Sequence, residues 1–143
     1  MFLGEYEHTL DEKGRVAIPA RFRGALQDGL VLTRGTDKCL VIWTLESWRA
    51  ISERVQDLSI WKADARRIQR LLFSGAVPTE TDKLGRVLVP AFLREYAELK
   101  DQVVLVGLMN RIEIWSKEAW EAERAAAEEH AAELAEHLSD LGL

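Results

Sequence analysis

Two stretches of the chain follow one pattern and decide how it folds: Asp11–Arg23 (DEKGRVAIPARFR) and Asp82–Arg94 (DKLGRVLVPAFLR). They begin 71 residues apart, and seven of their 13 positions hold the same residue. A second block repeats 72 residues apart, with the matched pairs Gly35 and Gly107, Trp43 and Trp115, and Trp48 and Trp120. Two blocks in the same order at nearly the same spacing indicate that one structural unit is duplicated.

Each copy predicts the same succession of elements. Gly14 and Gly85 suit a tight turn with positive φ. Pro19 and Pro90 suit the first turn of a short helix. Strands are expected at 15–18, 86–89, 30–34 with 39–43, and 103–107 with 111–115, and longer helices at 45–57, 60–73 and 116–138.

This pattern predicts an α+β fold in which two repeats interleave into one pseudo-twofold β-barrel core with peripheral helices. A unit of about 45–50 residues buries too little surface to be stable alone. The segment between the copies is not rich in Gly, Ser or Pro, which disfavours two separate beads on a linker. The expected parts are 1–57 (first repeat and its helix), 58–75 (bridging helix), 76–121 (second repeat) and 122–143 (acidic C-terminal helix).

The composition excludes several classes of protein. Of the 143 residues, 48% are hydrophobic and 30% charged, which is typical of a soluble globular chain. We expect a cytoplasmic location, because no apolar run approaches the roughly 18 residues of a membrane span and the first residues lack the basic region of a signal peptide. Cys39 is the single cysteine, and no Cys/His spacing indicates a metal site. No catalytic constellation stands out, so we expect no enzyme, no cofactor and no small-molecule substrate.

The net charge of −5 argues at first against nucleic acid, but the charge is unevenly distributed. Residues 117–143 carry eight acidic and two basic side chains, a net charge of −6. The other 116 residues therefore carry +1. Acidity is thus a property of the C-terminal segment, and the charge of the whole chain says little about the surface of the body.

The chemistry of the repeated loop favours DNA binding. The planar fork of arginine can bond O6 and N7 of guanine together, so Arg15 and Arg86 are expected to read bases. Asp11 and Asp82 would repel DNA and are expected to brace the turns, together with Gly14 and Gly85. The remaining basic residues of the loops and helix starts are expected to contact phosphates, which fixes the register without reading the sequence: Lys13, Arg21, Arg23, Lys83 and Arg94. For one copy alone, a solvated hairpin is the simpler interpretation; with two matched copies, DNA binding and a solvated hairpin are about equally well supported by the loops themselves.

The pattern Asp-x-x-Gly-Arg-Val-x-Ile/Val-Pro, at residues 11–19 and 82–90, resembles the swapped-hairpin DNA-binding domain of AbrB-type regulators. The opening at residues 2–11 and the bridge at 65–76 (ARRIQRLLFSGA) make the chain more similar to the MraZ family. The resemblance covers nearly the whole chain and thins after about residue 125.

Proteins of that family are bacterial transcriptional regulators of the division and cell-wall gene cluster. The resemblance therefore implies a sequence-specific DNA-binding protein, acting as an autoregulatory repressor in association with the nucleoid. It also implies a ring-shaped homo-oligomer that binds repeated promoter sites in double-stranded DNA, with Arg15 and Arg86 as the residues that contact DNA.

Two alternatives stay open. The chain could be an oligomeric protein-interaction module of antitoxin-like type, which the acidic C-terminal helix favours somewhat. Lys62, Arg66 and Arg70 recur every four residues and form one helical stripe. That stripe could be a second DNA surface, a solvated face, or a partner for acidic helices of the same or a neighbouring subunit.

Overall fold

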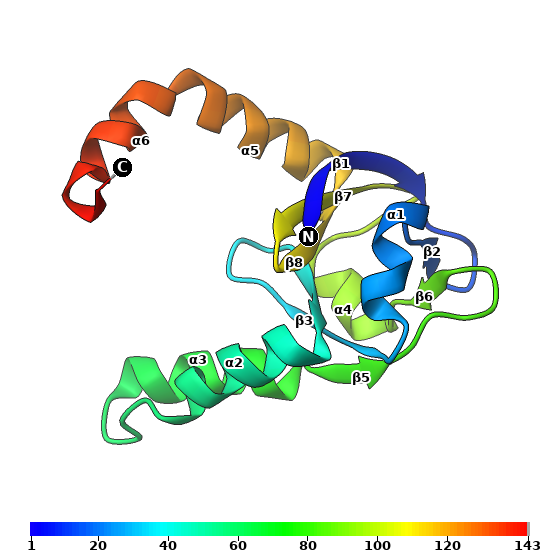
Figure 1. The fold of residues 1–143 in the computed structure, drawn as a ribbon, viewed down its shortest axis with the longest axis horizontal. Coiled ribbons are helices and arrows are strands. Elements are labelled where there is room, and N and C mark those ends of the chain that lie inside the picture. The colour runs from blue at the N-terminus through cyan, green and yellow to red at the C-terminus, as the bar shows by residue number, and fades with distance from the viewer. Residues whose placement is uncertain (143) are drawn as a thin grey trace.

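The computed structural model describes residues 1–142 as an α+β fold (Figure 1). Its strands are β1 (Phe2–Thr9), β2 (Arg15–Ala17), β3 (Leu30–Arg34), β4 (Leu40–Thr44), β5 (Val77–Thr79), β6 (Arg86–Leu88), β7 (Gln102–Met109) and β8 (Arg111–Ser116). Its helices are α1 (Ala20–Arg23), α2 (Leu45–Gln56), α3 (Ala63–Ser74), α4 (Ala91–Tyr96), α5 (Lys117–Glu129) and α6 (Ala131–His137), with 3₁₀ turns at Gly24–Leu26 and Ser139–Leu141. One antiparallel sheet has the order β1-β7-β8-β4-β3-β5, and β2 pairs with β6 in a second, small sheet.

The two repeats exchange strands, as the sequence predicts. Strand β1 of the first repeat pairs with β7 of the second, and β5 of the second pairs with β3 of the first. Strands β4 and β8 join the halves, with Val41 opposite Glu113 at the centre of the pairing. Val16 lies opposite Val87 at the centre of the β2–β6 pair. A pseudo-twofold axis therefore relates the repeats through these two central pairs.

The α+β fold and the interleaved core agree with the prediction, but the sheet does not close into a barrel, because β1 and β5 form its two edges within residues 1–142. Strand β5 has only three residues, and its Pro78 lacks the N–H that a further strand would need. The core is nevertheless shared, which excludes two separate beads. Buried side chains from both repeats pack in one cluster, among them Val16, Leu30, Leu32, Ile42, Val87, Val103, Leu105 and Ile114.

The sequence predicts that Gly35 and Gly107 occupy equivalent positions in the two repeats, and this prediction is wrong by one position. Arg34 lies opposite Leu40, and Gly107 lies opposite Ile112, so Gly107 takes the place of Arg34 in the repeat. The backbone of β1 crosses directly over Gly107 and leaves no room for a side chain there. Strand exchange, and not a hairpin turn, therefore explains this glycine.

Two helices differ from their predicted bounds. Helix α3 begins at Ala63 rather than at residue 60, and Trp61 lies in the preceding turn with 87% of its surface exposed. The helix predicted at 116–138 divides at His130 into α5 and α6, although neither glycine nor proline marks the break. Its start is as expected, because the Ser116 hydroxyl accepts a hydrogen bond from the backbone N–H of Ala119 at 3.2 Å.

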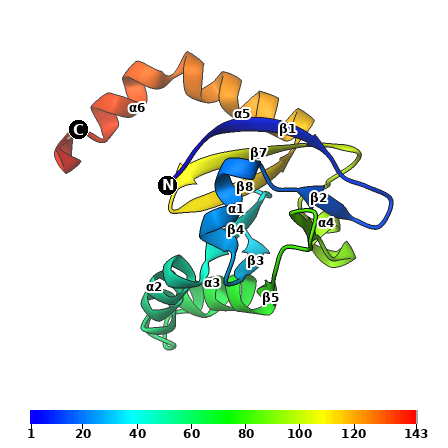
Figure 2. The same ribbon diagram turned by 45° about the vertical axis from the view of Figure 1, so that its right-hand side comes forward.

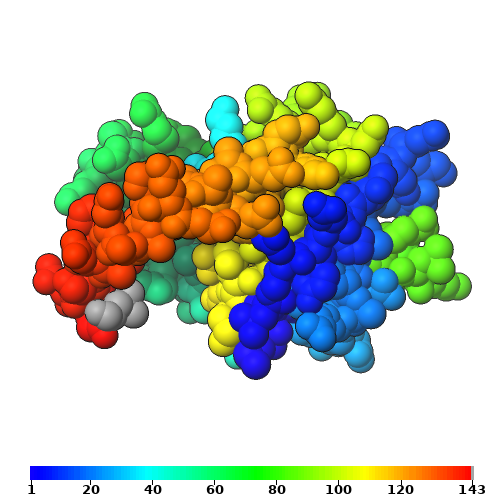
Figure 3. Space-filling view, turned by 90° about the horizontal axis from the view of Figure 1, so that it is seen from above, coloured from blue at the N-terminus to red at the C-terminus, as the bar shows by residue number. Residues whose placement is uncertain are grey.

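Helices α5 and α6 form an arm, residues 117–142, that starts on the sheet and then leaves it (Figures 1 and 2). The Trp120 indole N–H donates to Glu5 at 2.8 Å, and Arg124 forms an ion pair with the same carboxylate. From Glu121 onward every described residue is exposed, and Figure 3 shows the arm lying uncovered along one face. No helix within residues 1–142 is long and apolar enough to cross a membrane.

Candidate nucleic-acid interface

Each repeated loop is held by an aspartate that accepts three hydrogen bonds. Oδ1 of Asp11 accepts from the backbone N–H of Lys13 at 2.9 Å and from that of Arg15 at 2.8 Å. Its Oδ2 accepts from Nε of Arg15 at 2.7 Å. Asp82 holds the second loop in the same way, at 2.9, 2.8 and 2.8 Å. Two independent copies of the motif thus give the same local geometry.

The two aspartates are stabilised in their charged form. The pKa of each aspartate lies below the usual 3.8. The largest cause is the hydrogen bond that the carboxylate accepts from the backbone N–H of Arg15 or Arg86, and the side chain of the same arginine lowers the pKa further by donating a second hydrogen bond. Desolvation acts in the opposite direction without cancelling the effect. Each loop therefore holds its carboxylate ionised beside an arginine.

The contact with aspartate leaves the outer edge of each guanidinium free. Arg15 and Arg86 use Nε internally, and their two terminal nitrogens form no hydrogen bond within residues 1–142. The side chains are 30% and 29% exposed. A guanidinium fixed at Nε has lost much of its freedom before it meets a ligand, while both terminal nitrogens can still donate to one acceptor pair.

The small β2–β6 sheet brings the two arginines to one face. Val16 and Val87 are fully buried and point inward, so their neighbours along each strand point outward. Arg15 lies opposite Leu88, and Arg86 lies opposite Ala17. The arginines are therefore diagonal neighbours on the outer face, about 7–8 Å apart along the backbone diagonal and somewhat closer at their Cβ atoms. This outer face is called the arginine face below.

Arginines of each repeat pack under the loop of the other repeat. A side chain at Gly14 would collide with the guanidinium of Arg94, and one at Gly85 would collide with Arg23. Arg23 also donates from Nε to the carbonyl of Ile18 at 2.8 Å. Arg23 and Arg94 thus contact loop backbone, whereas the sequence suggests phosphate contacts for both.

The other predicted phosphate ligands surround the arginine face less symmetrically. Lys13 and Lys83 are exposed in the two loops but occupy different positions of the repeat, since Lys13 corresponds to Leu84. Arg21 is exposed on α1, and its NH1 donates to the Tyr6 hydroxyl at 3.1 Å.

Two exposed leucines lie beside the arginines and were not predicted as site residues. Leu84 is 65% exposed at the tip of the second loop, and Leu88 is 52% exposed opposite Arg15. Comparing the two copies could have identified them, because the first copy has Lys13 and Ala17 where the second has these leucines. The second half of the arginine face is therefore the more apolar half.

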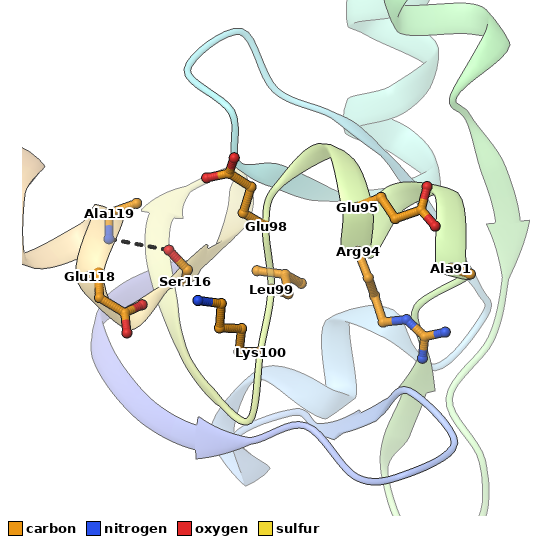
Figure 4. A pocket seen from close by; sticks show the side chains of 9 residues that line it. All are labelled: Ala91, Arg94, Glu95, Glu98, Leu99, Lys100, Ser116, Glu118 and Ala119. Atoms are coloured by element: carbon orange, nitrogen blue, oxygen red, sulfur yellow. Dashed lines mark hydrogen bonds between the residues drawn. The ribbon is translucent and has the colours of Figure 1, made fainter.

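One hollow of the surface lies away from the arginine face. It has a volume of about 860 Å³ between α4 and the start of α5, and it is lined by Glu95, Glu98 and Glu118 as well as Arg94 and Lys100 (Figure 4). Three carboxylates make it unsuited to a nucleic acid backbone. Within residues 1–142, no three His, Cys, Asp or Glu side chains gather in a way that could hold a metal ion.

The stripe predicted at Lys62, Arg66 and Arg70 is only partly a helix face. Lys62 precedes the first residue of α3, and Arg66 donates from NH1 to the carbonyl of Ile60 at 2.8 Å. None of the three forms an ion pair within residues 1–142. Helix α3 lies on the opposite side of the body from β2 and β6 (Figure 1).

Comparison with known proteins gives a consistent result over the whole chain. A family model described as "MraZ protein, putative antitoxin-like" matches twice, at residues 1–71 and 72–141. Proteins named transcriptional regulator MraZ are similar in Thermoanaerobacter pseudethanolicus (48% identical over 143 residues, all of both chains) and Herpetosiphon aurantiacus (48% over 143 residues, all of both chains). One from Roseiflexus castenholzii is 48% identical over 141 residues, 99% of each chain.

Proposed function

Because this chain belongs to the MraZ family, a family of transcriptional regulators, we propose that it binds specific DNA sequences through the arginine face. The observation that carries the proposal is the state of Arg15 and Arg86. Each is fixed at Nε by an aspartate and presents two free terminal nitrogens on one outward face. Those nitrogens match O6 and N7 of guanine in the major groove.

The remaining contacts divide between backbone and base edges. Lys13, Lys83 and Arg21 are exposed and suit phosphates, which add affinity and register. Leu84 and Leu88 suit the methyl group of thymine, an apolar feature of the major groove. Phosphate contacts by Arg23 and Arg94 stay a prediction, since both side chains support the loop of the opposite repeat.

The body is nearly neutral, so one chain should bind DNA weakly. Affinity then depends on several arginine faces acting together. A ring-shaped homo-oligomer on repeated promoter sites raises the effective concentration of each further contact after the first has formed. In this proposal the protein acts in the cytoplasm, on the nucleoid, as a repressor of the division and cell-wall gene cluster that includes its own gene.

The proposal is tested by selecting bound duplexes from a random pool and measuring their binding by gel shift. Arg15→Ala with Arg86→Ala should abolish the shift while leaving the oligomer size unchanged. Arg67→Ala is the matched control, since Arg67 is exposed on α3 and far from the arginine face. A shift that survives the double substitution removes the arginine face as the DNA site.

A second candidate is a partner-binding module of antitoxin-like type. The exposed acidic arm favours it, because an uncovered helical segment with a net charge of −6 suits a basic protein surface better than it suits DNA. Under this alternative, the random pool yields no enriched sequence and removal of the arm abolishes partner binding.

A further inference from the structure

The arm offers an uncovered surface that is both acidic and apolar. Its break at His130 gives it a concave side lined by Glu123, Ala127, Glu133 and Leu134. Leu134, Leu138 and Leu141 are 45%, 43% and 76% exposed. Leu134 lies on α6 and Leu138 caps its C-terminal end, whereas Leu141 ends the following 3₁₀ turn. The spacing of four residues places Leu134 and Leu138 on one side of the arm, and these two residues are called the leucine stripe of α6; such an exposed apolar stripe is normally covered by a partner.

A groove that could cover this stripe lies on the first repeat, between the α2–α3 helix pair and strands β4 and β8. It has a volume of about 490 Å³ and an apolar floor that includes Ile51, Val55 and Ile68. Arg54 and Arg111 lie at the same groove and form no ion pair within residues 1–142. Arg34, Asp37 and Glu113 also line it, so the groove has an apolar base with three basic and two acidic side chains around it.

One polar atom of the groove also lacks a partner. The indole N–H of Trp43 is buried and makes no hydrogen bond within the described chain. Its counterpart in the second repeat, Trp115, donates to Glu113 at 2.9 Å. The first repeat has Val41 where the second has Glu113, so no carboxylate of its own strand reaches Trp43.

From these observations we infer that the arm of one copy docks in the α2–α3 groove of a second copy. The leucine stripe of α6 covers the apolar floor, while Glu123 and Glu133 face Arg54 and Arg111. Charge complementarity selects this occupant, because the arm carries −6 and the segment from Leu45 to Gly75, which forms α2 and α3, carries six basic and four acidic residues.

The geometry of this contact determines the kind of assembly. Arm and groove are different surfaces of one chain, and the arm and the α2–α3 helix pair project from the same side of the body (Figure 1). A contact between unlike surfaces is heterologous and produces a closed ring or an open chain of copies. With 13 residues, α5 spans about 20 Å, so the arm can reach beyond its own body. The inference rests on the ring proposed above and names its interface.

Light scattering on the full-length protein after size-exclusion chromatography tests the inference by charge exchange. Wild type should elute at a multiple of 16.2 kDa. Glu123→Arg with Glu133→Arg should raise the concentration of half-dissociation on the order of 100-fold, as should Arg54→Glu with Arg111→Glu. The four changes together should restore the wild-type mass. Glu121→Arg is the control, since residue 121 lies about 200° around the helix from Glu123.

The outcomes separate this interface from the proposed function. An unchanged mass in the arm variant overturns the docking, as does a loss of mass that the four changes together do not restore. If the arm instead folds onto its own groove, wild type and both variants have the mass of one chain, and docking between copies is likewise overturned. In every variant Arg15 and Arg86 are intact, so binding of DNA that holds a single selected site should survive. If wild type itself does not bind that DNA, the assignment of the arginine face as the DNA site is contradicted, while the docking of the arm is unaffected.

Discussion

The guanidinium of Arg94 lies against the α-carbon of Gly14, in the loop of the opposite repeat, and Arg23 lies against Gly85 in the same manner. The carbonyl of Gly14 also accepts a hydrogen bond from the backbone N–H of Val89 at 2.8 Å. Each loop is therefore held partly by its own aspartate and partly by the other repeat. This reciprocal support keeps Arg15 and Arg86 in fixed relative positions.

Replacing Gly14 by alanine should destabilise the protein and disorder its loop. The residue has φ of +84°, and a methyl group there would collide with Arg94. Holding a residue other than glycine in the left-handed region of φ and ψ lowers the free energy of unfolding by on the order of 2 kcal/mol. For a chain of this size we expect the midpoint of thermal unfolding to fall by about 4–8 °C, as measured by circular dichroism.

Two further variants isolate the cause of that loss. Gly24→Ala is the matched control, since Gly24 has right-handed helical geometry and open space around it, so its midpoint should stay equal or rise. Adding Arg94→Ala to Gly14→Ala should recover part of the loss. Strictly additive effects of the two substitutions would show that the packing of Arg94 on Gly14 carries no energy.

Lysines beside the arginine face should control the salt dependence of binding. Lys13→Ala and Lys83→Ala each remove one expected phosphate contact, so the slope of log K against log salt should become shallower by about 0.9 for each. The preference for the selected site over other DNA should not change. Anisotropy titrations at several salt concentrations measure both quantities, and a changed preference with an unchanged slope would assign the lysines to bases.

Acid should weaken the loops in a defined direction. The pKa of Asp11 and of Asp82 is lowered by folding, so the stability that these carboxylates contribute is fully present above their ordinary pKa of 3.8 and is lost as the pH falls through the lowered values. Asp11→Asn with Asp82→Asn should lower the unfolding midpoint at neutral pH, and the difference from wild type should shrink below about pH 4. A difference independent of pH would exclude the charged bonds as its source.

The only thiol should be unreactive in the folded protein. Cys39 is buried, and desolvation, with help from Glu113 and Asp37, raises its pKa from 9.0 to about 12. The thiolate population at neutral pH is then about a thousandfold smaller than in the unfolded chain. Iodoacetamide should therefore label Cys39 only in urea, as followed by mass spectrometry. Rapid labelling of the native protein would mean that the β3–β4 hairpin opens freely.

Most of the structural features that could be predicted from the sequence follow from the internal repeat. Matched glycines, prolines and valines predicted two equivalent loops and an interleaved α+β core, because turn chemistry and strand periodicity are local properties. The offset at Gly107 could not be predicted locally, since it follows from the passage of β1 over that residue. Neither could the position of Arg94, because its contact with Gly14 joins residues 80 positions apart. The bend at His130 has no signal in composition.

In the proposed mode of binding, Arg15 and Arg86 read bases and do more than supply charge. The most direct test of this mode compares the binding of the selected site and of a scrambled duplex at one salt concentration, for wild type and for Arg15→Lys with Arg86→Lys. Lysine keeps the charge but loses the bidentate fork. We predict that wild type prefers its site about 1,000-fold or more, that the lysine variant loses about 100-fold of that preference, and that its binding to scrambled DNA is unchanged. An equal preference in both proteins, with fold and oligomer intact, would contradict the account.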